Sequence, residues 1–159
     1  GRWNVQALDE LIASSPVFAG MPAEYLALIA GCARNVGFDE GALLFREGDE
    51  ADTFYLVRRG RVAFELHTPD RGGLVIETAD PGDVVGWSWL FPPYRWHFDA
   101  RATEEVRAIA FDGACLRGKC DEDARLGYEL MQRFAQVMIR RLQATRLRLV
   151  DVYGVGAPA

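Results

Sequence analysis

Turn signals that recur roughly every ten residues between Val36 and Phe111 constrain the fold more than any other feature of this sequence. These signals are Asp39-Glu40-Gly41, Glu47-Gly48-Asp49, Arg59-Gly60, Pro69-Asp70-Arg71-Gly72-Gly73 and Asp80-Pro81-Gly82-Asp83. The short apolar runs between them are ALLFR, TFYLV, RVAFEL, LVIETA, FDARA and VRAIAF. Short strands at this spacing predict a compact antiparallel β-roll or jelly roll.

Helical patterns precede and follow this region. Residues 4–13 carry apolar side chains at helical spacing, and Pro22 opens a second helix that closes between Cys32 and Asn35. After the strands we expect a short helix over residues 112–119. The acids of residues 121–123 then suit the N-terminus of a long helix that runs to about Val152.

The predicted fold class is therefore α+β and mainly β, with an antiparallel roll flanked by short N-terminal helices and a long C-terminal helix. We expect one domain over residues 1–159. The first helices and the roll occupy about 14–111, the C-terminal helices occupy 112–152, and the tail GVGAPA is a frayed end.

Composition narrows the functional classes. Half of the 159 residues are apolar, and the net charge of −5 argues against a surface that binds nucleic acid throughout. No apolar run is long enough to cross a bilayer and no leader is visible, so we expect a cytoplasmic protein without a membrane contact. Cys32, Cys115 and Cys120 make no even disulfide framework, and we expect Cys115 and Cys120 to be idle thiols.

The long helix carries a second pattern, in which apolar or small residues alternate at spacings of four and three. These residues are Met131, Ala135, Met138, Leu142, Thr145, Leu149 and Val152. Such spacing is typical of a coiled-coil seam and predicts a homodimer through this helix. The arginines that flank the seam fit a solvated helix face better than a nucleic-acid contact.

The aromatic stretch GWSWLFPPYRWHF, residues 86–98, is the strongest candidate for a functional site. Catalysis is not indicated, because His67 and His97 stand far apart and lack candidate nucleophiles. Two isolated histidines also cannot supply the ligand set of a metal-binding jelly-roll enzyme. We therefore expect no metal and no enzymatic activity.

Three segments together resemble the cyclic-nucleotide-binding domain, the sensor half of catabolite-activator-type (Crp/Fnr) regulators. LFREGDEADTFYLVRRGRVAFEL (44–66) is similar to the family's glycine-punctuated strand pair. PGDVVGWSWLF (81–91) stands at the position of its phosphate-binding cassette, and RRLQAT (140–145) is similar to the centre of its dimerising helix. The resemblance implies a β-roll that binds a cyclic nucleotide, with the state of the site passed on through helix packing.

The resemblance also implies a ligand chemistry. Backbone N–H groups after a glycine and an arginine hold the cyclic phosphate, a glutamate after the glycine accepts from the ribose 2′-hydroxyl, and a threonine on the long helix reaches the purine across the seam. Gly86 and Thr145 match. Trp87 replaces the glutamate, and Trp96 and His97 replace the arginine and its neighbouring hydroxyl residue. The predicted ligand-binding residues are Gly86, Trp87, Ser88, Arg95, Trp96, His97 and Thr145.

Three interpretations of the aromatic stretch stay open, and the function we expect follows from the first of them, a stand-alone dimeric sensor that binds a small regulatory ligand. It forms an altered pocket for cyclic AMP or another compact anion, with Arg95 supplying the guanidinium, or it is an aromatic core without a further role. Alternatively, Trp87, Trp89 and Trp96 fill the pocket themselves, and the domain serves a protein partner. Only residues 154–159 follow the long helix, so we expect no DNA binding by this chain alone, either as a stand-alone sensor or as a sensor half without its helix-turn-helix.

Overall fold

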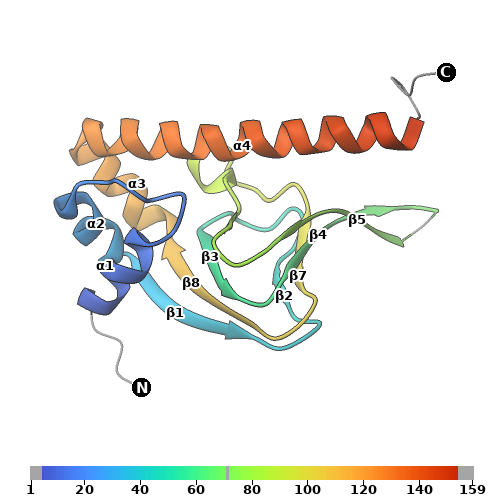
Figure 1. The fold of residues 1–159 in the computed structure, drawn as a ribbon, viewed down its shortest axis with the longest axis horizontal. Helices are drawn as coiled ribbons and strands as arrows, with labels where there is room; N and C mark the ends of the chain where they lie inside the picture. The colour runs from blue at the N-terminus through green and yellow to red at the C-terminus, as the bar shows by residue number, and fades with distance from the viewer. Residues whose placement is uncertain (1–4, 71, 154–159) are drawn as a thin grey trace.

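A computed structural model describes residues 5–70 and 72–153 of the chain. Its helices are α1 (Val5–Ala13), α2 (Ala23–Ala30), α3 (Gly113–Glu122) and α4 (Ala124–Tyr153), with a 3-10 turn η1 at Ser88–Leu90. The short helices gather at one end of the molecule, and α4 runs along one side of it (Figure 1). The expected helix start at Asn4, the turn residue Arg71 and the tail 154–159 lie outside the described residues.

The strands form two antiparallel sheets of four strands each. The strands are β1 (Ala33–Phe38), β2 (Leu43–Phe45), β3 (Thr53–Arg59), β4 (Val62–Thr68), β5 (Gly72–Ala79), β6 (Val84–Val85), β7 (Asp99–Ala102) and β8 (Val106–Asp112). One sheet has the order β1-β8-β3-β6 and the other β2-β7-β4-β5. The predicted α+β fold, with a β-roll and a long C-terminal helix, is confirmed.

Side chains of the first sheet divide between two hydrophobic cores because successive residues of a strand point to opposite faces. Phe54 and Leu56 of β3 pack with Phe134 of α4 and with the short helices. Tyr55 and Val57 point the other way, into the interior of the roll. The roll therefore has an aromatic interior of its own, separate from the core that attaches the helices.

The boundaries differ from the prediction in the first sheet. The second helix ends at Ala30, and β1 covers part of the segment that we expected to close it. β1 forms because its residues pair in register with β8, with Asn35 opposite Ile109. β6 is only two residues long and pairs with the middle of β3, so no periodic pattern marks it in the sequence.

The expectation of idle thiols is wrong for Cys115, which forms a disulfide with Cys32. The bond joins the residue before β1 to the first turn of α3. It escaped prediction because its cysteines are 83 residues apart in the sequence and meet only in the fold. Cys120 remains a free thiol, and burial raises its pKa, which lowers the thiolate fraction that would make it reactive.

Helix α4 has two different faces. Leu126, Leu130, Phe134 and Val137 are buried against the core. The predicted seam lies about one residue, or roughly 100°, around the helix, and it is solvent-exposed at Leu142 (52%), Leu149 (51%) and Val152 (76%). One helix thus attaches to its own domain and presents an uncovered apolar stripe.

Candidate functional site

Gly86 and Trp96 make the closest contact in the predicted site. Gly86 has a φ of +99°, and a Cβ built on it would lie 2.4 Å from Cη2 of Trp96. The indole of Trp96 is 3% exposed and stacks on Phe45, with ring centroids 3.8 Å apart and planes 9° apart. Trp96 therefore occupies the space directly beside the backbone at the start of the expected cassette.

The residues around Trp96 alternate between the interior and the surface. Trp96 and Phe98 are buried, whereas Arg95 and His97 are exposed. The backbone fixes this phase, because the N–H of Trp96 donates to the Asp49 carbonyl at 3.1 Å. Since neighbouring residues in an extended chain point in opposite directions, Arg95 and Trp96 cannot face the interior together.

Arg95 is thereby directed away from Gly86. Its Nη1 donates to the Gly48 carbonyl at 3.4 Å, and its Nη2 lies 4.0 Å from the Glu50 carboxylate. The structure places Arg95 and His97 on the surface, so it does not bring these two predicted ligand residues together with Gly86.

The other aromatic residues of the stretch belong to different surroundings. Trp87 is half-buried and meets Phe98 edge-on at 6.2 Å. Trp89 is fully buried and stacks on Phe54 at 4.6 Å, in the core that attaches the helices. Ser88 is buried in η1. Trp96 thus lies in the interior of the roll, whereas Trp87 packs on the helical core and reaches Phe98 at its edge, and Trp89 holds η1 to the helical side.

Arg141 of α4 lies against this site, although sequence reasoning placed it only as a flanking arginine of the seam. Its guanidinium carbon is 4.7 Å from the ring centroid of Phe64 and 5.3 Å from that of Trp87. Nη2 donates to the Val84 carbonyl, and Nε is 3.9 Å from the Glu77 carboxylate. The sequence could have indicated this position, because the second arginine of RRLQAT shares a helix face with Val137.

The charged groups of Arg141 and Glu77 are largely shielded from water. Burial lowers the pKa of Arg141, and the nearby Glu77 opposes that change. Burial raises the pKa of Glu77, against the opposing effect of Arg141. Among the described residues, the buried Nη1 of Arg141 has no hydrogen-bond partner. Arg141 therefore fastens α4 to the roll beside Trp87 and retains one unused donor.

Thr145 lies one turn farther along α4. It is exposed, and its hydroxyl donates to the Arg141 carbonyl of its own helix at 2.9 Å. No hydrogen bond found in the described part of the chain joins Thr145 to residues 86–98. It shares the exposed seam face with Leu142 and Leu149.

The family model for the cyclic nucleotide-binding domain matches residues 36–123, which is more than half of the chain. The chain belongs to the cyclic nucleotide-binding domain family. It is 26% identical over 151 residues to the CRP-like cAMP-activated global transcriptional regulator of Mycobacterium tuberculosis, covering 95% of this chain and 66% of that protein. The chain thus spans just under two thirds of that regulator's length.

Solved structures agree with this assignment. A candidate cyclic nucleotide-binding protein from Geobacter metallireducens is 30% identical, with a TM-score of 0.77 over 84% of this chain and 97% of that one. The regulatory domain of Toxoplasma gondii PKA with cAMP shares the fold at 18% identity and a TM-score of 0.71, over 86% of this chain and 50% of that one.

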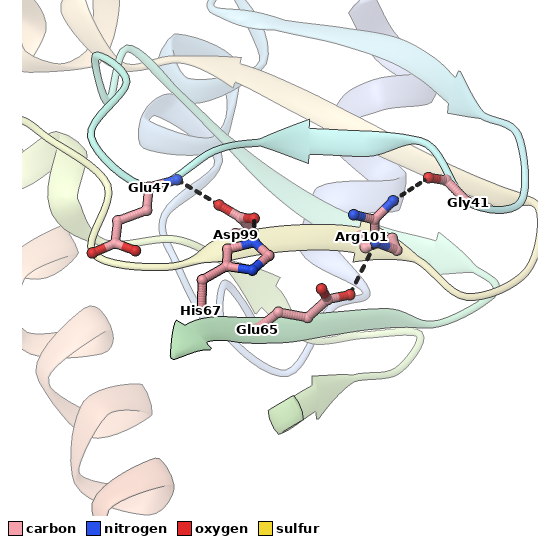
Figure 2. A network of polar contacts seen from close by, with 6 residues as sticks. All are labelled: Gly41, Glu47, Glu65, His67, Asp99 and Arg101. Carbon is pink, nitrogen blue, oxygen red and sulfur yellow. Dashed lines mark hydrogen bonds and ion pairs between the residues drawn. The ribbon is translucent and has the colours of Figure 1, made fainter. Parts of the chain in front are cut away.

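This cyclic nucleotide-binding domain also carries a polar network across β4 and β7 (Figure 2). His67 Nε2 lies 2.5 Å from Asp99 Oδ2, and the N–H of Glu47 donates to Asp99 Oδ1 at 2.7 Å. Beside them, Arg101 joins Glu65 at 3.0 Å and the Gly41 carbonyl at 2.8 Å. Burial alone would raise the pKa of Asp99, but the hydrogen bonds from Glu47 and His67, together with the charges of His67 and Arg101, hold the pKa below its ordinary value.

That network is a structural clamp between strands and loops. It ties β4 and β7 to the loop that follows β2, and the same loop holds Trp96 through its backbone. Among the described residues, no group of three or more histidine, cysteine or acidic side chains could hold a metal ion. Within the same ranges, no helix is long and apolar enough to cross a membrane.

Proposed function

We propose that this chain is the sensor half of a dimeric CRP-type regulator in which tryptophan side chains occupy the cyclic-nucleotide site. The contact between Trp96 and the Gly86 backbone carries this proposal. A cyclic phosphate needs that backbone surface to reach free N–H groups, and the indole covers it. The domain then acts through its protein contacts, above all those of α4, without a bound cyclic nucleotide.

The chemistry beside Trp96 favours the same conclusion. Trp87 offers only an indole N–H donor where a ribose hydroxyl would need a carboxylate acceptor. The charge of Arg141 is already shared with Glu77 and with the faces of Phe64 and Trp87. The space therefore contains a cation and apolar rings from the protein itself, which hold α4 against the roll.

The exposed seam of α4 supports the dimer. Met131, Leu142, Leu149 and Val152 stay uncovered because the helix uses its neighbouring face to pack on its own roll. Their alternating spacing of four and three matches knobs-into-holes packing against a second copy of the helix. Sedimentation equilibrium should show a dimer that Leu142→Glu converts to monomer. The matched control Gln143→Glu, one residue off the seam, should leave the dimer intact.

Calorimetric titration with cyclic AMP and then cyclic GMP tests the filled site. We expect no saturable heat from the wild type at millimolar nucleotide. The double variant Trp87→Glu/Trp96→Arg should gain binding, since it supplies the ribose acceptor and the phosphate partner. Trp87→Gln/Trp96→Met is the matched control, which opens space without adding charge. Micromolar binding by the wild type would contradict the proposal.

A second candidate function is a rewired site for a small anion, and one observation favours it. The buried Nη1 of Arg141 lacks an acceptor among the described residues, and an anion that reached it would supply one. In that case the wild type would bind cyclic AMP or another compact anion in the same titration. Loss of that heat in Arg95→Ala would further implicate Arg95.

The remaining aspects of the proposed function follow from this assignment. We propose a single domain without catalytic activity that works in the cytoplasm and has a protein partner. DNA binding by a CRP-like regulator would then depend on parts beyond this domain. A pull-down from a cell extract, compared between the wild type and Leu142→Glu, should recover the partner only if it recognises the dimer.

A further inference from the structure

An open cavity lies on the first sheet, away from the aromatic stretch. It has a volume of about 630 Å³ and is lined by Asn35 and Gly37 of β1, Arg58 and Arg59 of β3, and Arg107 of β8. Asn35 pairs with Ile109 and therefore shares the face that the short helices cover farther along the sheet. The volume falls within the roughly 300–1,000 Å³ typical of small-molecule sites.

Arg59, in the wall of this cavity, carries a positive charge that no ion pair compensates among the described residues. Arg59 and Arg107 are partners in the pairing of β3 with β8, and like charges in opposing positions destabilise a sheet. Arg107 has one acidic neighbour, Glu105, at 3.3 Å. Within residues 5–70 and 72–153, the Arg59 side chain makes no hydrogen bond or ion pair. Of these two adjacent guanidinium groups, only that of Arg107 has a carboxylate partner among the described residues, in a chain whose net charge is −5.

Asn35 contributes an unpaired hydrogen-bond donor to the cavity wall. Arg58 donates to Oδ1 of Asn35 at 3.4 Å. This hydrogen bond fixes the orientation of the amide and leaves Nδ2 as its remaining polar end. That Nδ2 is buried and has no acceptor among the described residues. A buried donor without a partner costs free energy, so an acceptor that enters the cavity would be stabilised here.

Gly37 leaves room for this arrangement. It pairs with Arg107 across β1 and β8, and a Cβ at Gly37 would lie 2.9 Å from Nη1 of Arg107. The guanidinium therefore lies across the glycine backbone beside the cavity, where a larger residue would displace it.

We propose that this cavity binds a small phosphorylated anion, with Arg59 and Arg107 as its charge partners and Asn35 as an added donor. The planar fork of guanidinium donors matches the oxygen geometry of phosphate, and the two adjacent arginines suit an anion with at least two charges. This inference is independent of the proposed function, because the cavity shares no residue with the cassette or the seam.

Titration of the full chain with pyrophosphate at low ionic strength tests the site. We expect saturable binding to one site, at least tenfold weaker in Arg59→Gln and in Arg107→Gln, and abolished in the double variant. Arg125→Gln removes an exposed arginine of α4 outside the cavity and should bind as the wild type does. Sodium chloride of matched ionic strength corrects for general screening.

Several outcomes would overturn the proposal. Unchanged binding in the double variant would place the anion elsewhere, for example on the arginines of α4. No saturable binding by the wild type would leave the cavity without an anion. A parallel titration with citrate separates phosphate from carboxylate, since tighter binding of citrate would refute the phosphorylated class. Amide shifts in NMR spectra at residues 35–37 should accompany pyrophosphate binding if the site is correct.

Discussion

Gly86 and Gly37 each leave space beside the backbone, but the protein uses the two spaces differently. At Gly86 the neighbour is the buried indole of Trp96, clamped between the backbone and Phe45. At Gly37 the neighbour is the exposed guanidinium of Arg107 at the side of an open cavity. The site that we expected to hold a ligand has a buried indole beside its glycine, whereas the cavity beside Gly37 is open and lined by arginines.

A chain can thus keep the fold of its family while different side chains stand at the expected ligand site. The chain has the β-roll fold of its family, while in the filled site that we propose aromatic side chains stand where a nucleotide would be read. Packing contributes stability where water is excluded, whereas unpaired donors and charges in an open cavity contribute affinity for a partner. Stability measurements should therefore separate the two sites.

Removing Trp96 should have the largest effect. Trp96→Ala should lower the free energy of unfolding by about 3–5 kcal/mol, as is typical for a buried tryptophan, because the stack on Phe45 is lost. Arg107→Ala should change it by less than about 1 kcal/mol, as a surface substitution does. Urea denaturation of both variants checks this. Equal losses would mean that the two sites do not differ in packing.

Adding one methyl group at each glycine is the next test. Gly86→Ala should cost about 3 kcal/mol, because a positive φ strains alanine and the methyl group overlaps Trp96. Gly37→Ala should stay within about 1 kcal/mol of the wild type, because only the end of a flexible side chain must move.

A double-mutant cycle separates the two causes at Gly86. In the Trp96→Ala background, Gly86→Ala should cost less than it does alone, since the overlap is gone and only the strain remains. Additive losses would show that the indole does not press on Gly86.

Asp99 is a charged group with hydrogen-bond partners, whereas Arg59 has none among the described residues. Replacing Asp99 therefore measures what a paired charge contributes to stability. Asp99→Asn should cost about 1.5–3 kcal/mol at pH 7, the range for hydrogen bonds to charged groups. Because folding lowers the pKa of Asp99, its contribution is present above the ordinary value of about 3.9 and is lost as the pH falls through the folded value. The two proteins should therefore converge in stability once the pH lies below the folded pKa of Asp99.

Asp80→Asn is the matched control for this comparison. Asp80 pairs with Arg61 at 2.8 Å, but both side chains are more than half exposed, so the change should be much smaller. A loss as large as that of Asp99→Asn would show that burial does not set the contribution.

The smallest effect concerns the repulsion in the cavity. Without an anion, Arg59→Gln should raise stability at low salt by a few tenths of a kcal/mol, about the size of a cross-strand charge effect. The gain should fade in about 1 M salt, where screening is nearly complete. A loss of stability at low salt would indicate that Arg59 has a favourable partner.

The sequence predicted the roll and the long helix well because both have periodic patterns. Its turn signals located most strands, and β1 was missed because its sequence ARNVGF lacks a clear apolar alternation. Whether Trp96 or Arg95 faces inward was readable in principle, since Trp96 and Phe98 alternate with Arg95 and His97. The sequence prediction instead placed Arg95 with Gly86 in the ligand-binding site.

Other features have no local signal at all. Arg59 and Arg107 are neighbours only through the pairing of β3 with β8, and sequence distance hides that register. The helix face that Arg141 shares with Val137 is readable locally, but its contact with Phe64 and Trp87 depends on how α4 crosses the roll. Prediction from sequence stops where contacts depend on pairing between distant segments.

The disulfide has a mechanical consequence. Cys32 and Cys115 fix the first turn of α3 to the start of β1, and the N–H of Asp112 adds a hydrogen bond to the Cys32 carbonyl at 2.9 Å. The chain leaves its helical conformation at Asp123, between α3 and α4. If α4 moves as a rigid helix, it therefore pivots at Asp123, and α3 stays fixed to the sheet.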